Sequence, residues 1–197
     1  MQHVVHETLI LHTWPVAWLM LLPQLPAQPS SLRVSVWRKI KQMGAHGLQS
    51  GVWLLPDQPE QHQWLLQLTG EIQAQAGTAS LWRAEHLHRL SEQDVQAAFN
   101  HDRQKEYAEV QERCSQFLAE VARETALDKF DFAELEELEQ DVHKLGDWLA
   151  RIARRDWFTE PSAETTAALL RRCEDILQPF AAEVYRRAGL DASGNGE

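Results

Sequence analysis

The sequence predicts an α+β protein in which a small α/β domain precedes a helical bundle. Two apolar, strand-like segments, residues 16–22 and 45–55, flank a short cationic helix, and this opening stretch contains no carboxylate. From Ser91 onward, apolar residues recur every three or four positions, which is the period of an amphipathic helix. The change of period near residue 90 therefore predicts two parts of different architecture.

The first strand and the first helix are marked by their ends. Residues 16–22 are a continuous apolar run, typical of a strand inside a sheet, and the prolines that follow prevent it from continuing as a helix. Ser30 or Ser31 is the expected N-cap of the helix, and Gly44 is its expected C-cap. The predicted buried stripe of this helix is Leu32, Val36, Ile40 and Met43.

The rest of the α/β domain completes a known pattern. Residues 45–55 are rich in strand-forming side chains, with a bulge or tight turn at Ser50-Gly51, so we expect them to supply two strands. A second helix opens near Pro59 and ends near Gly77, and residues 78–83 form a last strand. The resulting order, βαββαβ, predicts a ferredoxin-like domain.

Three amphipathic helices make up the second half. The first starts at a capping box at Ser91, with a break expected near Asn100, and the third starts after Pro161. Short connections between such helices predict an antiparallel bundle. We expect residues 1–13 to be an N-terminal extension, residues 14–88 the ferredoxin-like domain, residues 89–188 the bundle and residues 189–197 a disordered tail.

Charge is distributed unevenly along the chain. The formal net charge is −10, yet Asp and Glu are absent between residues 8 and 56. A chain this acidic is repelled by a phosphate backbone unless it presents a local cationic face. The apolar run after Trp14 is interrupted by prolines and is shorter than the roughly 20 residues of a membrane helix, so we expect no membrane association.

The candidate binding site is the cationic helix. A helix N-terminus attracts anions through its free N–H groups. All the charged side chains of this helix are positive, so we predict a DNA-binding or oxyanion-binding face. Its residues are Ser30, Ser31, Arg33, Arg38, Lys39 and Lys41. The alternative is an ordinary solvated helix face.

A second set of cations gives weaker candidates for an oxyanion site. It comprises Arg103, Arg151, Arg154 and Arg155, of which the last three also suit a helix C-terminus without any function. Cys114 and Cys173 lie on apolar stripes about sixty residues apart, which indicates buried core thiols and a reducing cytoplasm. His86 and His88 could both ligate a metal, but Glu85 is the one evident third ligand nearby and the signal is weak. We expect neither a metal nor a cofactor.

These motifs resemble a known family. The stretch WLMLLPQLPAQPSSLRVSVWRKIKQMGAHGLQSGVWLLP, the FNHDRQKEY segment and the Arg155-Asp156-Trp157-Phe158 element are similar to the N-terminal domain of ChrB, a bacterial chromate-resistance regulator family. The resemblance spans about residues 16–185. It implies a cytoplasmic, chromate-sensitive transcriptional regulator; full-length ChrB proteins have a further C-terminal domain.

The opening half is similar, more distantly, to the ferredoxin-like domain of PaaX-type repressors and to the small CRISPR adaptation nuclease. That nuclease family has a metal-binding Asp at the end of its first strand, where this chain has Gln24. An amide is a poor replacement for a carboxylate on a divalent ion, so we expect no enzymatic activity. The expected protein is a dimeric, DNA-binding regulator; the alternative is a dimerisation or scaffold protein with no nucleic-acid contact.

Overall fold

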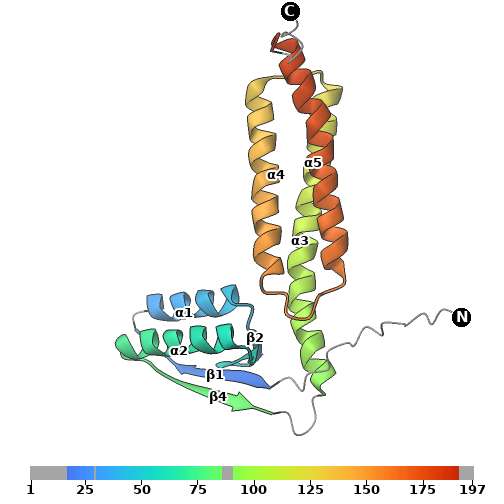
Figure 1. The fold of residues 1–197 in the computed structure, drawn as a ribbon. Coiled ribbons are helices and arrows are strands. Elements are labelled where there is room, and N and C mark those ends of the chain that lie inside the picture. Colours follow the sequence, from blue (N-terminus) through green and yellow to red (C-terminus); the bar gives the residue numbers. More distant parts are fainter. Residues whose placement is uncertain (1–16, 29, 86–90, 191–197) are drawn as a thin grey trace, which may run out of the picture. The chain divides into compact units, whose positions relative to one another are not determined.

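A computed structural model describes residues 17–28, 30–85 and 91–190. The expected extension over residues 1–13, His86, His88 and most of the expected tail lie outside these ranges. The chain divides into two compact units, residues 1–93 and residues 94–197. The structure confirms the α+β class and the order of a ferredoxin-like start followed by helices (Figure 1).

The first unit is built on one four-stranded sheet. Its strands are β1 (Trp18–Gln24), β2 (His46–Gln49), β3 (Val52–Pro56) and β4 (Thr78–Ala84), and its helices are α1 (Ser30–Gln42) and α2 (Pro59–Ala74). The strand order is β2-β3-β1-β4, with every neighbouring pair antiparallel. The predicted division of residues 45–55 into two strands is confirmed, because Ser50 and Gly51 form the turn between them and Gly51 has a φ of 75°.

The two helices of this unit lie side by side over the sheet (Figure 1). Leu19 pairs with Leu55 across β1 and β3, which places both side chains on the same face of the sheet. Both are at most 2% exposed, as are Ile40 of α1 and Leu65 of α2. The predicted stripe of α1 is therefore confirmed at Leu32, Val36 and Ile40.

Gly44 ends α1 as predicted. Its φ of 79° is in the left-handed region that favours glycine. The N–H of Gly44 donates to the carbonyl of Lys41 at 3.0 Å, and the N–H of Ala45 donates to the carbonyl of Ile40 at 3.3 Å. This closure turns the chain directly into β2 and fixes the cationic helix to the sheet at its C-terminal end.

The second unit contains three helices, α3 (Glu92–Ala126), α4 (Phe132–Ala153) and α5 (Ser162–Arg187). The break expected near Asn100 is absent, and α3 runs unbroken through that residue. The helices run alternately up and down, so α3 and α5 are parallel and α4 is antiparallel to both (Figure 1). Their shared core is lined by one stripe from each helix: Tyr107, Val110, Cys114, Phe117 and Val121; Leu135, Leu138, Leu145 and Ile152; Leu170, Cys173, Leu177, Phe180 and Val184.

Among the residues that the structure describes, no helix is both long enough and apolar enough to cross a membrane.

Candidate nucleic-acid interface

Helix α1 presents cations to solvent because its apolar residues are turned to the sheet. Leu32, Val36 and Ile40 are buried, and residues between them on the helical wheel point outward. Arg33 and Arg38 are exposed, and neither forms an ion pair with any other described residue. Ser30 and Ser31 are exposed at the start of the helix, whose first turn carries no acid.

An exposed tryptophan lies among these cations and was not predicted as part of the site. Trp37 is 54% exposed and Val34 is 49% exposed. Arg33, Trp37 and Lys41 are spaced four residues apart, so they follow one another along one side of the helix. That spacing is visible in the sequence, but an aromatic residue in a helix usually indicates core. The exposed face of α1 (Arg33, Val34, Trp37 and Arg38) thus combines charge with apolar surface.

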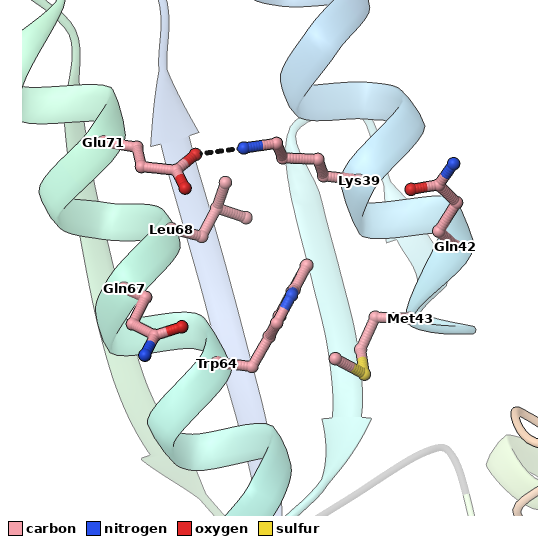
Figure 2. A pocket seen from close by; sticks show the side chains of 7 residues that line it. All are labelled: Lys39, Gln42, Met43, Trp64, Gln67, Leu68 and Glu71. Carbon is pink, nitrogen blue, oxygen red and sulfur yellow. Dashed lines mark hydrogen bonds and ion pairs between the residues drawn. The ribbon is translucent and has the colours of Figure 1, made fainter.

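Lys39 differs from the other cations of α1 because it has a carboxylate partner. Its Nζ pairs with Glu71 of α2, across the gap between the two helices (Figure 2). The pair is about half-exposed, with side-chain accessibilities of 42% and 50%, so solvent weakens it. Lys39 therefore faces α2, while Arg33 and Arg38 are free to bind an anion.

The same ion pair borders a groove of about 280 Å³ between α1 and α2. Met43 and Trp64 approach each other at one end, and the Lys39–Glu71 pair closes the other (Figure 2). Gln42, Gln67 and Leu68 complete its lining. Because the groove holds one cation and one anion, its charges largely cancel, and it offers an anion less than the outer face of α1 does.

Lys41 is held toward the sheet by an aromatic ring. Its Nζ lies 5.4 Å from the ring centroid of Trp53 on β3, within the range of a cation–π interaction. The six predicted residues of this site thus lie on one helix, with Lys39 committed to Glu71 and Lys41 stacked on Trp53.

Gln24 is the last residue of β1. It therefore occupies the strand end at which the nuclease family has its metal-binding Asp. It is exposed, and its side-chain oxygen accepts a hydrogen bond from the Thr78 hydroxyl at 3.3 Å. Within residues 17–28, 30–85 and 91–190, no group of three or more His, Cys, Asp or Glu side chains could hold a metal ion.

The second set of predicted cations lies in the bundle and is partly buried. Arg103 of α3 is 4% exposed, and its Nη1 lies 3.1 Å from a carboxylate oxygen of Glu106, without the alignment of a hydrogen bond. Arg155 reaches the same Glu106 oxygen at 3.0 Å. Burial lowers the pKa of the Arg103 guanidinium, whereas Glu106 opposes that change. One carboxylate thus joins two arginines from different segments.

Further acids surround this pair and fix the loop between α4 and α5. The Tyr107 hydroxyl donates to Asp156 at 3.0 Å, and Asp156 accepts the backbone N–H of Glu160 at 3.0 Å. Glu160 is 5% exposed and accepts the N–H of Ser162 at 2.8 Å, at the start of α5. Burial and the Asp156 carboxylate raise the pKa of Tyr107 well above its usual range.

This arrangement separates the four arginines predicted as a second oxyanion site into two kinds. Arg103 and Arg155 have carboxylates around them, so an incoming oxyanion would meet negative charge. Arg151 and Arg154 are exposed near the end of α4, where positive charge complements the helix dipole. The geometry therefore favours α1 over the bundle as the anion-binding surface.

Comparison with known families agrees with the motifs in the sequence. A family model described as "Protein ChrB, N-terminal" matches residues 33–190. This match begins at Arg33 and extends through the bundle. The chain belongs to the ChrB N-terminal family. The expected resemblance to ChrB is thereby confirmed.

A curated relative supports the same family. Protein ChrB of Cupriavidus metallidurans (strain ATCC 43123 / DSM 2839 / NBRC 102507 / CH34) is 34% identical over 93 residues, which is 47% of this chain. The aligned region is 28% of that ChrB protein. The likeness therefore concerns a minor part of the relative's length.

Proposed function

We propose that this ChrB-type chain is a non-enzymatic regulator of the chromate response that binds DNA through the exposed face of α1. Membership of the ChrB N-terminal family suggests the chromate-resistance role. The observation that carries the DNA proposal is a helix with four cations and no carboxylate, in a chain whose net charge is −10. Such a local reversal of charge is what binding to a polyanion requires.

The side chains of this face suit a nucleic-acid backbone. Arg33 and Arg38 are unpaired within the described residues, and guanidinium groups bind phosphate through two parallel hydrogen bonds. Contacts of this kind position a protein on DNA. Trp37 adds an exposed aromatic surface between them, which can pack on sugars or bases. A homodimer in the cytoplasm, the assembly we propose, would present two such helices to two half-sites.

An oxyanion such as chromate is the second ligand proposed for the same helix. The hydroxyls of Ser30 and Ser31 and the guanidinium of Arg33 lie at a helix start without acids. An anion bound there would compete with phosphate for Arg33. The competing proposal, a scaffold protein with no nucleic-acid contact, predicts no DNA binding under any of these conditions.

The test is fluorescence anisotropy of labelled DNA from the protein's own promoter, titrated with the purified full chain. Arg33→Gln/Arg38→Gln should weaken binding at least tenfold, because two phosphate contacts are lost. The matched control is Arg171→Gln/Arg172→Gln, which removes the same charge from exposed positions on α5 and should bind like the wild type.

The same titration with chromate, and with sulfate as a control anion, tests the oxyanion. If chromate weakens DNA binding and sulfate does not, the result would support a chromate-sensitive regulator. Equal effects of both anions would indicate simple ionic competition. No DNA binding by the wild type would favour the scaffold.

A further inference from the structure

The two cysteines of the chain meet in the core of the bundle. Cys114 of α3 and Cys173 of α5 are both 0% exposed, and the Cys173 sulfur donates to the backbone carbonyl of Cys114 at 3.6 Å. The chain has two cysteines in all. Residues 59 positions apart in the sequence are therefore in direct contact between neighbouring helices.

The contact has a fixed position along α3 and α5. The Gln111 side chain donates to the Thr166 hydroxyl at 2.7 Å on one side of it. On the other side, Arg187 forms an ion pair with Asp128 at 2.5 Å. Because the two helices are parallel, these bonds hold one register, and the cysteines face each other within it.

We propose that Cys114 and Cys173 form a disulfide across the bundle core when the protein is exposed to a hydroperoxide. The Cys114 thiolate attacks a peroxide oxygen, which breaks the O–O bond and gives a sulfenic acid and one water from hydrogen peroxide. The Cys173 sulfur then attacks the sulfenic sulfur, an S–S bond forms, and a second water leaves. Two thiols and one hydrogen peroxide thus yield one disulfide and two waters, with two electrons passing to the peroxide.

The surroundings assign the order of the two steps. Burial raises the pKa of both thiols, and that of Cys173 reaches about 12. Cys173 is the donor in the contact between the two residues, and a hydrogen bond from its side chain opposes the rise at Cys114, so we assign Cys114 as the attacking sulfur. Since both sulfurs are buried, the oxidant reaches them only when the bundle opens locally. The reaction should be slower than that of an exposed thiol.

The test uses the full-length protein under native conditions. After treatment with hydrogen peroxide, the sample is unfolded, remaining thiols are alkylated, and intact mass is measured. The inference predicts monomers that have lost two hydrogens and take up no alkylating reagent, with a raised Tm because the disulfide restricts the unfolded chain. Three results would each overturn it: a peroxide-treated protein that keeps its helices and still has two free thiols, a disulfide between two chains, or a disulfide that forms only in denaturant.

Two single variants test the order of the steps. In Cys173→Ala, peroxide should produce a Cys114 sulfenic acid that dimedone traps. In Cys114→Ala, Cys173 should give at least tenfold less dimedone adduct. Equal trapping in both variants would overturn the assignment of Cys114 as the attacking sulfur. The inference is independent of DNA binding, since both cysteines lie in the bundle.

Discussion

Arg103 shows how the same residue type serves different purposes in the two units. On α1 the arginines are exposed and unpaired within the described residues, whereas Arg103 is 4% exposed beside Glu106. A buried charge is costly without a partner. We therefore interpret Arg103 as part of the packing that holds the α4–α5 loop to α3.

Removal of this buried arginine should destabilise the bundle. Arg103→Ala leaves Glu106 and its neighbours without one of their cations, and we expect a loss of about 3 kcal/mol. Arg151→Ala and Arg154→Ala, both at exposed positions, should each change stability by about 0.5 kcal/mol or less. Urea denaturation followed by circular dichroism measures all three. Equal, small losses would show that Arg103 is not structural.

Cys173 predicts how bundle stability depends on pH. Its folded pKa of about 12 lies above the unfolded value of about 8.5, because burial disfavours the thiolate. Above about pH 8.5 the folded state therefore keeps a proton that the unfolded state loses. The contribution of Cys173 to the free energy of unfolding is fully present below that pH and declines as the pH rises toward 12.

At pH 10 this decline amounts to up to about 2 kcal/mol. Urea denaturation at pH 8 and pH 10 should show a larger loss for the wild type than for Cys173→Ala, both under reducing conditions. The comparison is needed because Tyr107, whose pKa is also raised, acts in the same direction in both proteins. The same loss in both would contradict the assignment to Cys173.

At the scale of elements, local signals predicted most of the fold. Gly44 and the four-residue spacing of Leu32, Val36 and Ile40 were sufficient to predict α1, because a helix C-cap and a hydrophobic period act over a few residues. The sequence did not predict that α3 is one continuous helix. Asn100 has a low helix propensity, and the contacts that keep it in a helix cannot be read from the sequence.

Helix α4 begins at a side chain whose effect can be measured. Asp131 accepts the backbone N–H of Glu134 at 2.9 Å, which is an N-cap. Asp131→Ala should cost about 1 kcal/mol, whereas Asp131→Ser retains a capping oxygen and should cost less. Thermal denaturation of the three proteins compares them. Equal Tm values for all three would indicate that solvent satisfies this N–H group as well as the cap does.

At the scale of the whole chain, contacts between distant residues limited what the sequence could tell. Lys39 is separated from Glu71 by 32 positions, so its pairing depends on how α1 and α2 pack. Cys114 and Cys173 meet only because α3 and α5 adopt one register. The exposure of Trp37 likewise depends on what covers the helix. The cationic surface of α1 could be predicted from the sequence. Which of its cations pair with other side chains could be seen only in the fold.

The central claim is that α1 binds DNA by its phosphates, and the salt dependence of affinity tests it most directly. Each lost phosphate contact lowers the slope of log K against log[salt] by about 0.9. Measured on promoter DNA at several salt concentrations, Arg33→Gln/Arg38→Gln should have a slope shallower than the wild type by about two, with Arg171→Gln/Arg172→Gln unchanged. Identical slopes for all three proteins would contradict the claim.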